Sequence, residues 1–143
     1  MLAGAGRQLT KIWERIYLGS LKDAERLARS NRQRIATVIS LCQERPAERA
    51  PKIIYIRLPI ADSRPIPAQK FEDIMFAIAI GVRRGNVLVH CFEGLNRSPI
   101  LTAAWMDRCG YADVDKALTE IARKRDLVPS RTLLTSVEGL LRG

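Results

Sequence analysis

Long hydrophobic runs are absent from this chain of 143 residues. The most apolar stretch, around residues 76–82, is far shorter than the roughly 20 residues that a membrane-spanning helix requires, so no membrane span is expected. The first ten residues also lack the continuous hydrophobic stretch and small-residue cleavage site of a secretion signal. We therefore expect a cytoplasmic protein.

Histidine and cysteine are scarce as well. The single histidine, His90, excludes zinc sites built on several histidines, and any Ser-His-Asp triad would have to use it. We expect no metal and no other cofactor. The three cysteines (Cys42, Cys91 and Cys109) make an odd number without paired spacing, which argues against a disulfide framework and indicates a reducing compartment.

The length and the 47% hydrophobic content suit one domain over residues 1–143, with no room for a second. The formal net charge of +9 comes from 24 basic and 15 acidic residues. This excess favours an anionic partner such as a phosphorylated protein, a nucleic acid or an acidic lipid. The basic residues are spread along the whole chain, however, so genome composition explains the charge equally well.

Strand-like and helix-like segments alternate along the chain. Strands are expected over residues 12–18, 35–42, 53–60 and 86–90, and helices over 21–33 (capped by Ser20), 68–85, 98–109, 113–125 and 130–141. This order predicts an α/β domain with a central, mostly parallel sheet of about four or five strands and helices on both faces. Ligands bind beyond the carboxyl ends of such strands, so the loops after 53–60 and 86–90 are placed to meet.

The segment HCFEGLNRS, at positions 90–98, lies between a buried strand and a helix. The backbone N–H groups of such a loop and the helix N-terminus surround one point, which makes a pocket for an oxyanion. Gly94 lets the backbone curl, and the planar guanidinium of Arg97 can hold two phosphate oxygens. The same groups favour the thiolate form of Cys91, which makes this residue a nucleophile. His90 points to the other face of its strand, so we expect it to support the loop.

This segment resembles the signature of protein tyrosine and dual-specificity phosphatases, which reads His-Cys, five residues, Arg and then Ser or Thr. Other segments of the chain resemble parts of the small dual-specificity phosphatase domain, and they follow one another in the order found in that domain. These segments are IYLGSLKDA, VISLC, ADSRPIP followed by FEDIMFAI, and SPILTAAWMDRCGYADVDKALTEIARKRD. The resemblance extends from about Ile12 to Leu134. It implies a phosphocysteine on Cys91, whose breakdown Ser98 assists. It also implies that the phosphoryl group is bound by Arg97 and the loop residues Phe92, Glu93, Gly94, Leu95 and Asn96.

The family takes the proton for the leaving group from an aspartate on a loop upstream of the cysteine, and Asp62 occupies the matching place. Asp62 follows a predicted strand and precedes prolines that stiffen the loop. The resemblance therefore implies that Asp62 is the general acid and then the base toward water. Without the resemblance, a single loop aspartate is more often a turn residue or a helix cap.

Two loop positions depart from the commonest pattern. Glu93 stands where alanine is usual, and its carboxylate is expected to face outward because an inward charge would oppose the thiolate. Asn96 creates the sequence Gly-Leu-Asn-Arg, which resembles the loop of the phosphatase-like RNA 5′-triphosphatases.

The leading hypothesis is a protein phosphatase that hydrolyses phosphotyrosine and also phosphoserine or phosphothreonine. The alternative is an RNA 5′-triphosphatase or another non-protein phosphatase. Asn96 and the basic charge favour removal of the terminal phosphate from RNA 5′ ends, whereas Ser98 and Asp62 weaken it. A third hypothesis is a phosphate-binding adaptor without turnover. The joint presence of Cys91, Arg97, Ser98 and Asp62 argues against it, since an inactive relative need not retain the cysteine.

Overall fold

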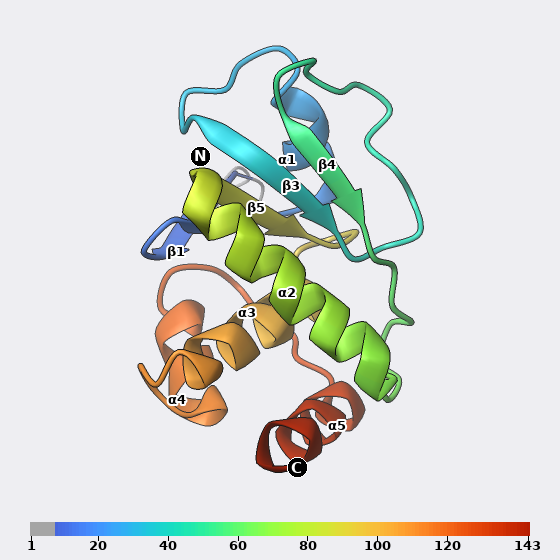
Figure 1. Cartoon of the computed structure of the whole chain (residues 1–143), viewed down its shortest axis with the longest axis vertical. Helices are drawn as coiled ribbons and strands as arrows, with labels where there is room; N and C mark the ends of the chain where they lie inside the picture. The colour runs from blue at the N-terminus through green and yellow to red at the C-terminus, as the bar shows by residue number, and fades with distance from the viewer. Residues whose placement is uncertain (1–7) are drawn as a thin grey trace.

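The computed structural model describes residues 8–143, in which five strands form one sheet in the order β1-β2-β5-β3-β4 (Figure 1). The strands are β1 (Thr10–Trp13), β2 (Ile16–Gly19), β3 (Ile35–Ser40), β4 (Ile54–Arg57) and β5 (Asn86–His90). The pairs β2–β5, β5–β3 and β3–β4 are parallel, and β1 pairs with β2 in the antiparallel sense. The mostly parallel sheet that the sequence predicts is therefore confirmed.

The prediction of one continuous first strand over residues 12–18 is wrong. The chain turns back between β1 and β2, and Glu14 takes a left-handed backbone conformation there, with φ of 54°. This turn carries no glycine, asparagine or proline, the residues that usually signal a reversal. The apolar residues on either side of it therefore look like one continuous strand in the sequence.

The described part of the chain also contains five helices: α1 (Leu21–Arg26), α2 (Ala68–Arg84), α3 (Arg97–Arg108), α4 (Val114–Ala122) and α5 (Arg131–Arg142). Ser20 caps α1 as predicted, in a reciprocal capping box with Asp23. However, α1 is shorter than the predicted range of 21–33. Asn31 ends the connection by binding both backbone groups of Ile35, at 2.8 and 3.0 Å, so the chain enters β3 instead of continuing as a helix.

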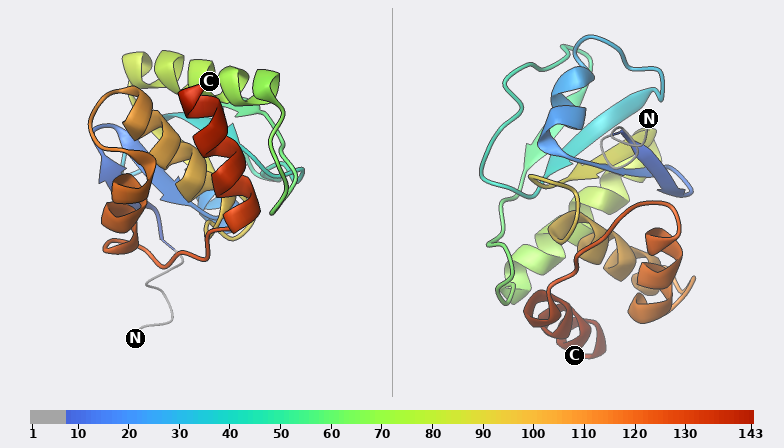
Figure 2. Two further views of the ribbon diagram at one scale, coloured as in Figure 1. Left: turned by 90° about the horizontal axis from the view of Figure 1, so that it is seen from below. Right: turned by 180° about the vertical axis from the view of Figure 1, so that it is seen from behind.

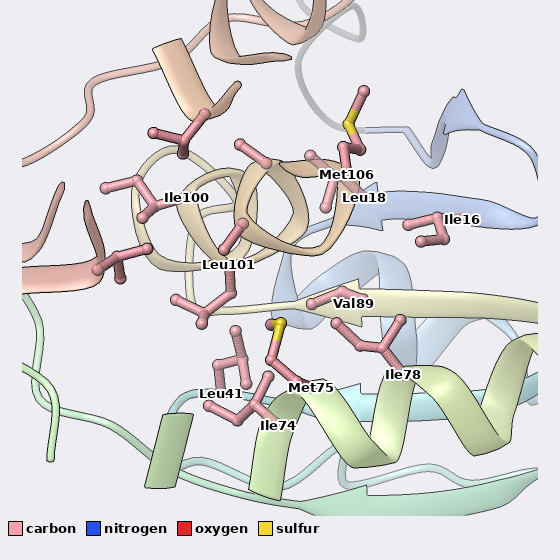
Figure 3. Packing of buried hydrophobic residues seen from close by; sticks show 14 of the residues in the cluster. Ile16, Leu18, Leu41, Ile74, Met75, Ile78, Val89, Ile100, Leu101 and Met106 are labelled. Atoms are coloured by element: carbon pink, nitrogen blue, oxygen red, sulfur yellow. The ribbon is translucent and has the colours of Figure 1, made fainter. Parts of the chain in front are cut away.

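Helices cover both faces of the sheet, but unequally (Figure 2). Helix α1 lies on one face, where Ala24 and Leu27 pack with Val38 of β3 and Leu88 of β5. The other four helices lie on the opposite side and enclose the larger core: α2 and α3 pack on the sheet, and α4 and α5 pack against α3. Figure 3 shows residues of this core, including Leu18, Ile78, Val89 and Leu101. None of the helices in residues 8–143 has the length and apolarity needed to cross a membrane.

The carboxyl ends of the parallel strands lie side by side at one edge of the sheet. Ser40 at the end of β3 is the register partner of His90 at the end of β5. Beyond the strands, the N–H of Leu41 donates to the carbonyl of His90 at 2.9 Å, and the N–H of Leu21 donates to that of Phe92 at 3.0 Å. These bonds fix the start of the loop that joins β5 to α3.

Candidate active site

A pocket of about 360 Å³ opens at this edge of the sheet. It is lined by Gln43, Glu44, Asp62, Cys91, Phe92, Glu93, Asn96 and Arg97. The structure thus gathers six predicted site residues, together with Gln43 and Glu44 from the loop after β3, which sequence reasoning missed. Cys91 is only 2% exposed, whereas Phe92 is 47% exposed and Glu93 is also exposed. Because Glu93 lines the pocket, the outward direction of its carboxylate stays a prediction. The other predicted residues do not line the pocket: His90, Gly94 and Ser98 are buried, and Leu95 is half-buried.

Ser98 lies beside the cysteine in the first turn of α3. Its hydroxyl oxygen is 3.3 Å from the sulfur of Cys91, and both side chains are buried. A serine hydroxyl can donate a hydrogen bond to a sulfur at this distance. Ser98 is therefore placed to stabilise negative charge on the sulfur.

The guanidinium of Arg97 is anchored at one end and free at the other. Its Nη1 donates to the carbonyl of Ile60 at 3.1 Å, and its Nε lies 3.8 Å from a carboxylate oxygen of Asp62. Within the described residues, this buried Nε has no hydrogen-bond partner. Because buried donors are rarely left unpaired in native proteins, this Nε is placed to donate to an anion in the pocket.

Asp62 lies on the loop between β4 and α2, and its side chain is 60% exposed. The side-chain amide of Asn96 donates to its Oδ1 at 2.6 Å. The carboxylate that the sequence singles out is therefore held beside both the cysteine loop and Arg97. Two loops separated along the chain meet here, as expected from the carboxyl ends of parallel strands.

The ring of His90 faces away from the thiol of Cys91 and into the sheet. Because a carbonyl can only accept, Nδ1–H donates to the carbonyl of Cys91 at 3.1 Å, and the hydroxyl of Ser40 donates to Nε2 at 2.6 Å. Burial lowers the pKa of His90, so the ring is neutral at pH 7. The ring therefore supports the loop through its backbone, in the arrangement that the strand alternation predicts.

Arg125 is a buried contact of the loop that sequence reasoning missed. Its side chain is fully buried, and its Nε donates to the carbonyl of Gly94 at 3.2 Å. Its Nη1 donates to the carbonyl of Gln8 at 2.7 Å and to the hydroxyl of Thr10 at 3.1 Å, and its Nη2 lies 3.8 Å from Asp23. Arg125 thus holds the outer side of the loop against β1 and α1. In the sequence it is one arginine among many.

The next loop residue is held in the same way, because the N–H of Val128 donates to the carbonyl of Leu95 at 2.8 Å. The carbonyls of Gly94 and Leu95 thus both accept hydrogen bonds from residues outside the loop. Binding of the phosphoryl group by these residues stays a prediction.

Replacing Gly94 by alanine is expected to destabilise the fold and to lower phosphatase activity. Gly94 has φ of 80°, and an added Cβ would lie 2.5 Å from Nη2 of Arg125 and 2.8 Å from the carbonyl oxygen of Gly19. The backbone strain and the clash together should cost about 2–4 kcal/mol. Urea unfolding and phosphate release would measure both effects.

Gly110 provides a matched control for this substitution. Its φ is 79°, but no described atom lies within 4 Å of an added Cβ. Gly110→Ala should therefore cost only the backbone strain, about 1 kcal/mol, and leave activity unchanged. Equal losses in the two variants would contradict the claim that the close approach at Gly94 shapes the loop.

The two cysteines outside the loop have a different chemical character. Cys42 is buried and donates to the carbonyl of Glu44 at 3.5 Å, and burial together with the carboxylate of Glu44 raises its pKa to about 11. Cys109 is exposed, but the protein atoms around its thiol partly desolvate it and raise its pKa. Both residues are therefore protonated at neutral pH. Residues 8–143 contain no group of three or more ligand-type side chains that could hold a metal ion.

A cysteine between a central parallel strand and a helix, with a free arginine donor facing the same pocket, is the arrangement expected of a cysteine-dependent phosphatase. The model of the family "dual specificity phosphatase, catalytic domain" matches residues 16–137. The chain therefore belongs to the dual specificity phosphatase family.

Individual relatives agree with this assignment. Dual specificity protein phosphatase 15 of Homo sapiens is 35% identical over 108 residues, which cover 72% of this chain and 36% of the relative. The chain thus spans about a third of the length of that relative. The crystal structure of DUSP15 is 30% identical, with a TM-score of 0.68, and the match covers 96% of this chain and 94% of that one. Human DUSP28 has a TM-score of 0.80 over 94% and 96% of the chains, and at 22% identity it shows the fold.

Proposed function

We propose that this chain is a phosphomonoester hydrolase that acts on phosphorylated proteins, with phosphotyrosine and also phosphoserine or phosphothreonine as substrates. The observation that carries the proposal is the meeting of Cys91, Arg97, Asp62 and Ser98 around one pocket. Membership of the dual specificity phosphatase family supports the same activity. In this proposal the phosphatase domain extends over residues 1–143.

In the first step, the sulfur of Cys91 attacks phosphorus in line and the bond to the leaving oxygen breaks. The free Nε of Arg97 and the N–H groups of the loop bind the phosphoryl oxygens, where they stabilise the charge of the transition state. Asp62 donates its proton to the leaving oxygen, so the departing group is a neutral alcohol or phenol. The products are a phosphocysteine and an ionised Asp62.

In the second step, water attacks the phosphocysteine. The carboxylate of Asp62 accepts a proton from this water, which restores the acid for the next cycle. The bond between sulfur and phosphorus breaks, and the sulfur departs as a thiolate. The hydroxyl of Ser98, 3.3 Å away, donates a hydrogen bond to that thiolate and so lowers the barrier.

The RNA 5′-triphosphatase hypothesis receives less support from this geometry. The side chain of Asn96, which favours that hypothesis in the sequence, is engaged with other protein groups. The acidic residues Glu44 and Glu93 also line the pocket, and their negative charge would oppose the binding of three linked phosphates. A single phosphate on a protein side chain carries less negative charge than a triphosphate, so these acidic residues oppose its binding less.

We also propose that the protein acts in the cytoplasm. All three cysteines are free thiols, and free thiols are typical of a reducing compartment. Fractionation of the cells that produce this protein would test the assignment. Recovery in an oxidising compartment would contradict it.

The central experiment measures phosphate release from a panel of phosphopeptides, phosphoinositides, phosphorylated sugars and triphosphate-ended RNA. Phosphopeptides are expected to be the best substrates. The activity should survive a chelator and should be blocked by vanadate, an analogue of the phosphoryl group. A clear preference for triphosphate-ended RNA would replace the proposal with the alternative.

Replacing Asp62 by asparagine is expected to lower kcat on phosphopeptides by about 10²–10⁴, the usual contribution of a general acid. An alkoxide or phenolate needs a proton in order to depart, whereas a nitrophenolate departs with little help. The loss on nitrophenyl phosphate should therefore be much smaller, and KM should change little. Kinetics over a series of leaving groups would measure the difference.

Asp73→Asn is a matched control, because Asp73 accepts a hydrogen bond from Gln69 on the exposed surface of α2. This variant should keep full activity on every substrate. Equal, small losses on all substrates in Asp62→Asn would mean that Asp62 is only a loop residue. Robust phosphate release from triphosphate-ended RNA by that variant would favour the RNA hypothesis.

A further inference from the structure

The side chain of Asn96 connects two elements outside its own loop. Its Nδ2 donates to Oδ1 of Asp62 at 2.6 Å, and its Oδ1 accepts from the backbone N–H of Ser130, the residue that caps α5, at 2.7 Å. A carboxylate only accepts and a backbone N–H only donates, so the orientation of the amide is unambiguous. Both ends of the amide are therefore used, and the link runs from α5 to Asp62.

This use of the side chain is unusual for the position of Asn96. Asn96 is the N-cap residue of α3, where asparagine commonly accepts a hydrogen bond from an N–H group of the first turn. In the described structure, its side chain makes no such bond. The N–H groups of the first turn are therefore left for the phosphoryl group, while the side chain holds Asp62.

Asp62 has few other restraints. Its side chain is 60% exposed, the hydroxyl of Ser63 is 3.5 Å from Oδ1, and the Nε of Arg97 is 3.8 Å from that oxygen. Ser63 has φ of 58°, a left-handed conformation that non-glycine residues seldom adopt. Among the described residues, the bond from Asn96 is thus the shortest contact that restrains this carboxylate, which lies in a turn of uncommon geometry.

We propose that Asn96 is a positioning residue for the reaction: it fixes the carboxylate of Asp62 over the pocket through Oδ1 and leaves Oδ2 to carry the transferred proton. The inference rests on the proposed function, in which Asp62 is the general acid. Asn96 immediately precedes Arg97 in the chain, so the acid and the phosphate-binding arginine keep a fixed relative position. Such alignment matters because displacing a catalytic group by about 1 Å can reduce a rate about 10²-fold.

The test is Asn96→Ala, assayed on aryl phosphates whose leaving groups range from phenol to nitrophenol. With its restraint removed, Asp62 should protonate the leaving group less efficiently. We expect kcat to fall roughly 10- to 100-fold on the phenyl ester and by no more than about 2-fold on the nitrophenyl ester. The affinity for vanadate should stay within about 2-fold of the wild type, because the N–H groups and Arg97 are retained.

The double variant Asn96→Ala, Asp62→Asn distinguishes positioning from a general structural effect. If Asn96 acts through Asp62, adding Asn96→Ala to Asp62→Asn should cost no more than about 2-fold on any ester. Ser136→Ala is the matched control, since the hydroxyl of Ser136 on α5 accepts from the N–H of Ile66 in the same loop, at 3.0 Å. It should leave the leaving-group dependence unchanged.

Two results would overturn the proposal. They are equal losses on all esters in Asn96→Ala, and a loss that multiplies fully with that of Asp62→Asn. If Asp62→Asn itself shows no dependence on the leaving group, the assignment of the acid fails, and the role of Asn96 fails with it. Thermal unfolding of each variant would show whether a loss of folded protein accounts for lower activity.

Discussion

Replacing Cys91 by serine is expected to reduce turnover by about 10⁵–10⁶, the scale of loss when a covalent nucleophile is removed. A serine hydroxyl needs a base to become a nucleophile, and the neighbouring His90 is not placed to act as one. The ring of His90 is directed to Ser40 and to the carbonyl of Cys91. Hydrolysis of phosphopeptides and nitrophenyl phosphate over long incubations would measure the loss.

Binding should survive this substitution, because the N–H groups of the loop and Arg97 are retained. Calorimetry with tungstate, an oxyanion analogue of phosphate, should give an affinity close to that of the wild type. Cys109→Ser is the control, since Cys109 is exposed and lies outside the pocket, and it should keep full activity. Full activity in Cys91→Ser would contradict the covalent mechanism.

Replacing Arg97 by lysine is expected to reduce kcat by about 10³–10⁵, comparable to the loss of an arginine that stabilises a phosphoryl transition state. The guanidinium donates to Ile60 from Nη1 and keeps Nε free for the anion. An ammonium keeps the charge but loses this planar, two-sided geometry. Single-turnover kinetics would measure the loss at the step that forms the phosphocysteine.

Arg108→Lys is the matched control for this variant. Arg108 makes two bonds to Glu72, at 2.6 and 3.1 Å, and it lies at the opposite end of α3 from Arg97. The same change of shape there should leave catalysis unaffected. Near-normal activity in Arg97→Lys would show that positive charge alone suffices in the pocket.

Elements with a strong local pattern could be predicted closely from the sequence. The strand over 86–90 has the predicted limits because it is a short apolar run between a glycine and the loop. Helix α2 ends one residue before the predicted limit because its apolar stripe and Gly85 mark its extent. The reversal at Glu14 was missed because its turn carries no glycine, asparagine or proline, whereas the early end of α1 was missed although Asn31 marks it.

The residues of the candidate site also differ in how well the sequence predicts them. Cys91 and Arg97 lie in one continuous motif, so the sequence places them together. Asp62 could be assigned only through the family resemblance, because the pairing of its loop with the motif is a long-range contact. Arg125 and Ser130 contact the loop from 31 and 34 positions away, and no local pattern identifies such partners.

The bond between Arg125 and Gln8 also bears on how the domain folds, because it joins residues 117 positions apart. Closing so long a segment has an entropic cost, and topologies rich in such distant contacts fold slowly. The same guanidinium binds the carbonyl of Gly94. The shape of the loop from Cys91 to Arg97 therefore depends on contacts with both ends of the domain. A catalytically competent loop thus forms only when the distant residues Gln8 and Arg125 have come together.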